Sequence, residues 1–218
     1  MHDGFGKGRK PASVAPGPRA KPLKRPTQAR ARFTVEAIYE AFVRICRRDG
    51  WAGVTTRAVA LEAGVAVGTL YDYFPSKEAL LSGYVRHCLE SLAARIDSEV
   101  IAPPLDWRER VRRLLDLGAG LGMPLVDGEL LQLEQLIAEP KHHQRVYEEL
   151  AGKWREALQA CVDLPRPVDA DTAEALFMAA WGGWRYALLL ELDAPRRRRW
   201  QAQLEQLYLA RLGGQGSG

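Results

Sequence analysis

Residues 55–81 read TTRAVALEAGVAVGTLYDYFPSKEALL. Apolar residues recur with helical spacing at about 56–63 and again at about 67–74, and Gly64 and Val65 separate the two stretches. Gly64 can take the left-handed backbone conformation that a tight turn requires, and Val65 can fill the corner. This stretch therefore predicts two short helices joined by a tight turn.

Each of these predicted helices has one face suited to packing. Val59, Ala60 and Ala63 form the inner face of the first, and its small alanines allow the second helix to cross closely. Leu70 and Phe74 are four residues apart and point inward from the second helix. Its outward side chains are Val67, Thr69, Tyr71, Asp72 and Tyr73. Two short helices, the second with an exposed polar and aromatic face, are typical of a helix-turn-helix that binds DNA.

Helical spacing continues along the chain from Thr34 onward, with no convincing alternating strand and no glycine-rich phosphate loop. We therefore expect an all-α fold. The further helices are expected at about 34–49, 76–101, 106–121, 125–138, 141–162, 170–192 and 196–212. Prolines and glycines separate most of them, and Pro75 and the pair Pro103–Pro104 end two of them.

The composition argues against several classes of protein. With 47% hydrophobic and 27% charged residues, the chain has the make-up of a soluble globular protein. No apolar run approaches the about 18–20 residues of a membrane span, and the first residues lack the apolar core of a secretory signal, so we expect a cytoplasmic protein with no membrane partner. Cys46, Cys88 and Cys161 lie far apart without CxxC spacing, which fits a reducing compartment.

Catalytic and metal-binding patterns are not evident in the sequence. His142 and His143 are adjacent, so on a helix they diverge by about 100° and cannot converge on one ion. No Ser/His/Asp or Cys/His arrangement presents itself either. We therefore expect no metal, no cofactor and no enzymatic activity.

Charge is distributed unevenly along the chain. Residues 1–33 contain nine lysines and arginines and one acidic residue, whereas the net charge of the whole chain is +4. The first 26 residues are also rich in glycine and proline and have almost no large apolar side chains, so we expect a disordered basic arm at 1–30. A basic arm on a mildly acidic body favours attraction to a polyanion at one end. The sequence leaves open whether this arm contacts DNA.

The chain resembles the TetR family, the tetracycline-repressor-like regulators, over about residues 34–81. The resemblance is carried, in order, by Thr-Thr-Arg at 55–57, Ala-Gly-Val at 63–65, Leu-Tyr-Asp-Tyr-Phe at 70–74 and Pro-Ser-Lys-Glu-Ala-Leu at 75–80. It implies a three-helix DNA-binding domain with a helix-turn-helix at 31–80, a helical ligand-binding and dimerisation domain at 81–212, and a flexible tail at 213–218. The resemblance implies a transcription regulator in the form of a repressor. Such a protein binds a roughly palindromic double-stranded operator as a homodimer, and a small-molecule effector releases it.

The resemblance also implies roles for individual residues. The implied DNA-binding residues are Thr56, Arg57, Val67, Gly68, Thr69, Tyr71, Tyr73 and Lys77. The resemblance implies that Arg57 reaches a base edge and that three of them face the major groove, namely Val67, Gly68 and Tyr71. The hydroxyl and ammonium groups of the remaining four, Thr56, Thr69, Tyr73 and Lys77, suit contacts with phosphates. Ser76 is expected to cap the following helix, whereas Ala66 stands where the family usually has a capping hydroxyl, at a cost of about 1 kcal/mol. Val67 replaces a common polar residue and can offer an apolar contact to a thymine methyl group instead.

The predicted helix at 170–192 is apolar on nearly all sides, so we expect it to be buried on more than one side. We expect it to pair with the last helix in a four-helix dimer interface, and the alternative is that both lie wholly in the core of one chain. The expected interface residues are Ala179, Gly183, Trp184, Trp200, Leu204 and Leu207. The candidates for an effector pocket are Trp107, Leu117, Gln132, Gln135, His143, Tyr147 and Trp181.

Two other functions stay open at this point. One is a helical small-molecule-binding protein or enzyme with a vestigial helix-turn-helix, and the other is a protein that coats DNA nonspecifically through its basic arm. The run Arg196–Arg199 is interpreted as a solvated turn rather than a second nucleic-acid contact. Salt-dependent binding that is selective for sequence separates the regulator from both alternatives.

Overall fold

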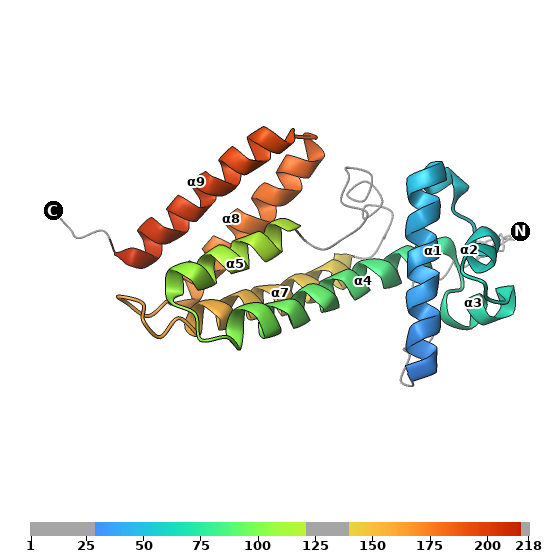
Figure 1. Cartoon of the computed structure of the whole chain (residues 1–218), viewed down its shortest axis with the longest axis horizontal. Coiled ribbons are helices and arrows are strands. Elements are labelled where there is room, and N and C mark those ends of the chain that lie inside the picture. Colours follow the sequence, from blue (N-terminus) through green and yellow to red (C-terminus); the bar gives the residue numbers. More distant parts are fainter. Residues whose placement is uncertain (1–28, 121–139, 215–218) are drawn as a thin grey trace, which may run out of the picture.

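The computed structural model describes residues 29–120 and 140–214, and throughout these ranges the regular structure is helical (Figure 1). The helices are α1 (Ala29–Gly53), α2 (Thr56–Glu62), α3 (Val67–Tyr73), α4 (Lys77–Arg95), the π-helix η1 (Ile96–Ile101), α5 (Trp107–Gly120), α7 (Pro140–Gln159), α8 (Ala170–Leu189) and α9 (Ala194–Gly213). The expected all-α class is confirmed. The arm expected at 1–30, apart from the first residues of α1, and the helix expected at 125–138 lie outside the described residues.

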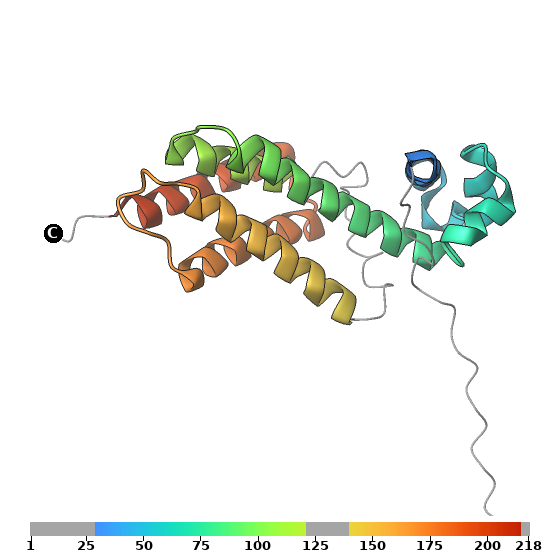
Figure 2. The ribbon, with the colours of Figure 1, turned by 90° about the horizontal axis from the view of Figure 1, so that it is seen from below.

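The molecule has a small three-helix end and a larger helical body, and α4 connects them (Figure 1). Seen from below, α1 is viewed along its axis while α4 and α7 run beside one another through the body (Figure 2). The α1–α4 contact is aromatic, because the ring of Tyr84 in α4 lies 5.7 Å from that of Tyr39 and 5.4 Å from that of Phe42. One helix is therefore packed into both parts of the molecule.

The helix-turn-helix forms as its sequence predicts. The Thr55 side chain caps α2 by accepting a hydrogen bond from the backbone N–H of Ala58 at 3.0 Å. Gly64 has φ of 67°, so it takes the left-handed conformation that the turn requires. Leu70 and Phe74 are buried, and replacing a buried phenylalanine with alanine typically costs about 3–5 kcal/mol. This small core fixes the outward face of α3.

The far end of α4 differs from the expected regular helix at 76–101. The extent is as expected, but the last turns at Ile96–Ile101 form a π-helix. The guanidinium of Arg110 in α5, which is 5% exposed, donates hydrogen bonds to carbonyl groups at this end, including those of Val100 and, at 3.0 Å, Ile101. The Lys153 ammonium of α7 pairs with Asp97 at 2.9 Å. The end of α4 is thus held by both α5 and α7.

The body core is centred on aromatic side chains between α7, α8 and α9. Trp154 donates its indole N–H to the Tyr208 hydroxyl at 3.0 Å, and that hydroxyl donates to the carbonyl of Leu176 at 2.6 Å. Burial raises the pKa of Tyr208 well above its usual range, which keeps the hydroxyl protonated and able to donate. No described helix is both long enough and apolar enough to cross a membrane.

Candidate DNA-binding surface

The outer face of α3 is the most distinctive exposed surface of the three-helix end. Val67 is 38% exposed and Tyr71 47% exposed, although both are large apolar or aromatic residues. Gly68 is exposed between them, and a Cβ atom built there would meet nothing within 4 Å. A helix that presents such residues beside a glycine leaves room for another surface to approach its backbone closely.

A hydrogen bond joins the start of α2 to this face. Thr56 Oγ1 and the Tyr71 hydroxyl lie 3.0 Å apart, so two of the residues expected to bind DNA contact one another. This contact restrains the Tyr71 ring, which is 47% exposed. One hydroxyl donates to the other, so one hydroxyl hydrogen of the pair stays free to donate to DNA.

Lys77 is held at the start of α4 by Trp51, a residue that the sequence did not single out. Its ammonium group lies 4.4 Å from the centre of the Trp51 ring and donates to the Trp51 carbonyl at 3.4 Å. A cation over an aromatic ring is attracted by the electron-rich face of that ring. The long Lys77 side chain is therefore directed along the α1–α4 junction rather than left to sample many positions.

The other expected DNA-binding residues have different environments. Arg57 is exposed near the start of α2, and Thr69 is half-buried on α3. Tyr73 is also half-buried, with its ring 6.3 Å from that of Phe74, so it contributes to the core as well as to the surface. The expected contacts of these residues with DNA stay predictions.

The two expectations about helix caps are confirmed. Ser76 caps α4 by accepting a hydrogen bond from the N–H of Ala79 at 3.1 Å. Ala66 occupies the cap position of α3 and makes no capping hydrogen bond with its side chain. Helix α3 thus begins without a side-chain cap, and the hydroxyl cap lies at the start of α4.

An ion-pair cluster joins α1 to α2 beside this surface. Arg44 Nε donates to Glu62 at 2.9 Å, and Arg48 reaches the same carboxylate at 3.4 Å. These hydrogen bonds hold the pKa of Glu62 below its usual range. The side chains are exposed, so each pair contributes little to stability. Their effect is to neutralise an acidic group close to the DNA-binding surface.

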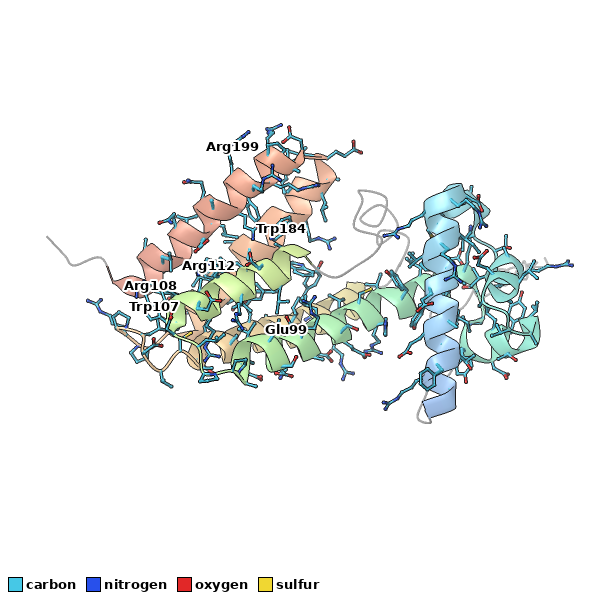
Figure 3. All side chains as sticks on the ribbon, viewed as in Figure 1. Glu99, Trp107, Arg108, Arg112, Trp184 and Arg199 are labelled. Carbon is cyan, nitrogen blue, oxygen red and sulfur yellow. The ribbon has the colours of Figure 1, made fainter. Side chains whose placement is uncertain are left out.

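Those candidates for an effector pocket whose side chains the structure describes do not form one cluster. The Tyr147 and Trp181 rings lie 5.7 Å apart in an edge-to-face arrangement, whereas Trp107 lies at the end of the body far from α1–α3, where its ring approaches Gly213 (Figure 3). Leu117 is buried in the core. Gln132 and Gln135 lie outside the described residues, as does the side chain of His143. Effector binding by any of them stays a prediction.

The expected dimer residues divide into buried and exposed members. Trp184 and Leu204 are buried within the chain, and the rings of Trp184 and Trp200 pack 5.2 Å apart between α8 and α9 (Figure 3). Gly183 allows this contact, because a Cβ atom there would meet the Trp200 ring. The two exposed members are Ala179 and Leu207. Most of the apolar residues that the sequence assigned to a dimer interface therefore pack between α8 and α9 of the same chain.

Sequence reasoning missed the most exposed apolar residues of α8. They are Met178, Tyr186, Leu189 and Leu190, which are 50–63% exposed. Their spacing places them on one face with Ala175, Ala179 and Gly182, and we call this set the α8 stripe. A helix that is apolar all round gives no periodic signal, so only the fold distinguishes the face packed within the chain.

Among the described residues, no group of histidine, cysteine and acidic side chains is arranged to hold a metal ion.

Comparison with known proteins identifies the three-helix end. Residues 38–83 match the model of the bacterial regulatory proteins of the tetR family. Similar proteins include the HTH-type transcriptional repressor KstR of Mycolicibacterium smegmatis, 43% identical over 65 residues, which are 30% of this chain and 32% of that protein. The nucleoid occlusion factor SlmA of Vibrio vulnificus is 33% identical over 69 residues, 32% of this chain and 35% of that protein. The match thus spans about a third of the length of these relatives.

Solved structures extend the likeness to the body. The fatty acid degradation regulator FadR of Bacillus halodurans has a TM-score of 0.60 at 19% identity, covering 80% of this chain and 97% of that one. A TetR-family transcriptional regulator from Mesorhizobium loti has a TM-score of 0.58 at 20% identity, covering 84% and 98%. At these identities the likeness concerns the fold. The helix-turn-helix sequence, its geometry and the matched model assign residues 38–83 to the tetR family, and the described body shares the fold of these solved regulators.

Proposed function

We propose that this protein is a transcriptional repressor that binds operator DNA through α3 and the start of α2. The observation that carries the proposal is the outer face of α3, where Tyr71 is held by Thr56 and Gly68 leaves space for close approach. A helix with such a face can enter the major groove, while Lys77 at the start of α4 supplies a charge for the backbone. The names of the KstR relatives, which are repressors, support the same activity.

Binding of fragments from the genome of the source organism tests this proposal. Purified protein is incubated with sheared genomic DNA at physiological salt, and bound fragments are sequenced. We expect a small set of enriched fragments that share an inverted repeat, since two identical reading heads favour a palindromic site. Enrichment that follows DNA length alone would support nonspecific coating instead, and no DNA binding would support the small-molecule-binding alternative.

We further propose that the α8 stripe, together with Leu207 of α9, forms the interface of a homodimer. Met178, Tyr186 and Leu189 expose more than half of their surface on one face of one helix. Apolar surface gathered in this way is typical of a protein–protein contact, and Ala179 and Gly182 allow a second helix to approach closely. A two-fold pairing would supply the two reading heads that a palindromic operator requires.

Sedimentation equilibrium of variants tests the interface. Tyr186→Glu places a charge on the α8 stripe and is expected to shift the protein from dimer toward monomer at micromolar concentration. Val162→Glu is the matched control, since Val162 is 95% exposed in the loop after α7 and lies outside the stripe. A Tyr186→Glu protein that stays fully dimeric would contradict this interface.

The proposed effector acts on the body, and α4 is the element through which it would change DNA binding. The start of α4, with Ser76 and Lys77, lies next to the proposed DNA-binding face of α3, while Arg110 and Lys153 hold the segment at its far end. A small molecule can shift this helix only by binding the two arrangements unequally. The Tyr147–Trp181 pair is the best-supported contact for an apolar or amphipathic molecule, since the buried Trp181 indole N–H has no hydrogen-bond partner among the described residues.

A thermal-shift screen followed by operator binding tests the effector. Compounds that raise the melting temperature of the protein are expected to include one that lowers operator affinity, and Trp181→Phe is expected to weaken binding of that compound. A broad screen in which no stabilising compound alters operator affinity would contradict regulation by a small molecule.

A further inference from the structure

The side chain that projects most directly from α3 is a carboxylate. Leu70 and Phe74 mark the buried side of the helix. Successive residues of a helix are about 100° apart, so Asp72 lies on the side of α3 directly opposite Leu70 and Phe74. Gly68 lies one turn before Asp72, on that same outer side. Asp72 is exposed and forms no hydrogen bond or ion pair with any residue in the described part of the chain.

An unpaired carboxylate at this place is unfavourable unless DNA supplies a partner. Phosphates surround the major groove, so a negative charge that enters it is repelled and loses water. The acid Glu62 on α2 is neutralised by Arg44 and Arg48, whereas within 29–120 and 140–214 Asp72 has no such partner. The repulsion is offset only if the carboxylate accepts a hydrogen bond from a base.

The chemistry of the major groove restricts which base that is. Guanine presents two acceptors there and thymine one acceptor and a methyl group, so neither can donate to a carboxylate. Adenine presents a donor beside the N7 acceptor, which repels a carboxylate. The cytosine base itself presents only a donor in the major groove, its N4 amino group. Aspartate is short, so its carboxylate reaches a base only if the backbone of α3 lies close to the base edges. Gly68, on the same side of the helix, permits this approach because it has no side chain.

We propose that Asp72 is a residue that determines operator specificity, by accepting a hydrogen bond from the N4 amino group of a cytosine in each half-site. The proposal rests on the proposed function, since it assumes that α3 enters the major groove. Asp72 then contributes in two ways, favouring a C·G pair at one position and weakening binding to all other sequences through repulsion. An acidic residue on a recognition helix therefore raises sequence selectivity and does not raise the overall affinity for DNA.

Selection from a library of randomised duplexes tests the proposal with three proteins. The wild type is compared with Asp72→Asn, which has the same shape without the charge, and with Glu36→Gln, which removes one negative charge from an exposed residue of α1. Asparagine pairs with adenine through N6 and N7, so Asp72→Asn is expected to move the preference at one position from cytosine to adenine. The expected loss of discrimination for cytosine is about tenfold, the effect of one hydrogen bond to a charged group. Binding to unrelated DNA is expected to strengthen.

The outcomes separate this proposal from the proposed function. If the wild type and Asp72→Asn select the same motif, the assignment of Asp72 is overturned while the repressor proposal stands. The same holds if Asp72→Asn changes the preference only at positions where the wild type did not prefer cytosine. If the wild type selects no motif, the proposed function itself fails. An identical change in Glu36→Gln would show that total charge is responsible, and it would also overturn the assignment. Far-ultraviolet circular dichroism and the melting temperature establish that each variant is folded.

Discussion

Replacing Gly183 with alanine tests the packing of α8 against α9. A Cβ atom at this position would overlap Cζ2 of Trp200 and would lie 2.9 Å from Cε2 and 3.0 Å from Cη2 of the same ring, closer than such atoms normally approach. The Trp200 ring has little freedom to move away, since it packs edge-to-face on Trp184 at 5.2 Å. Overpacking of this kind costs about 1–3 kcal/mol, whereas replacing glycine with alanine inside a helix contributes about 1 kcal/mol of stability.

Gly152 in α7 provides the matched control, because a Cβ atom there would meet nothing within 4 Å. Gly152→Ala is expected to raise the free energy of unfolding by about 1 kcal/mol, and Gly183→Ala to leave it unchanged or lower it by up to about 2 kcal/mol. The difference between the two variants, about 1–3 kcal/mol, isolates the steric cost because the helix propensity cancels. Urea denaturation followed by circular dichroism, at equal protein concentration, measures it. Equal stability of the two variants would refute the close α8–α9 contact.

Three further predictions concern the DNA-binding end and the thiols. Lys77→Gln is expected to weaken binding about equally for all sequences and to reduce the slope of log affinity against log salt by about one; an unchanged slope would remove Lys77 from the phosphate contacts. In a double-mutant cycle, Thr56→Val and Tyr71→Phe are expected to show a coupling of about 0.5–1.5 kcal/mol in the free energy of unfolding, whereas additive effects would show that their hydrogen bond contributes nothing. Burial raises the pKa of Cys88 and of Cys161 to about 11, so at pH 8 only about one thiol in a thousand is ionised. Ellman's reagent is therefore expected to react slowly with the native protein and rapidly after unfolding, and rapid reaction of the native thiols would contradict their burial.

The helix-turn-helix was predictable from sequence because its determinants are local. Leu70 and Phe74 are one turn apart, Gly64 is needed for a left-handed turn, and Ser76 caps the helix that it precedes. Each of these signals operates within a few residues, so spacing alone reveals them. The position of Asp72 on the same face as Gly68 follows from the same spacing.

The parts that could not be predicted depend on contacts between distant segments. Lys77 is held by Trp51 across 26 residues, and Arg110 binds carbonyl groups at the end of another helix. Nothing in the local sequence of either residue specifies these partners. The same holds for α8, where Trp184 and Met178 are both apolar, but only the fold shows that the first is buried and the second exposed.

The most direct test of the central claim is the ratio of affinities for a selected operator and for an unrelated duplex, measured by fluorescence anisotropy at one salt concentration. The wild type is expected to bind the operator at least about a thousandfold more tightly than the unrelated duplex. Tyr71→Ala, at a position that is 47% exposed, is expected to fold normally and to lower this ratio by about tenfold or more. A folded Tyr71→Ala protein that keeps the wild-type ratio would contradict the assignment of α3 as the helix that reads the operator.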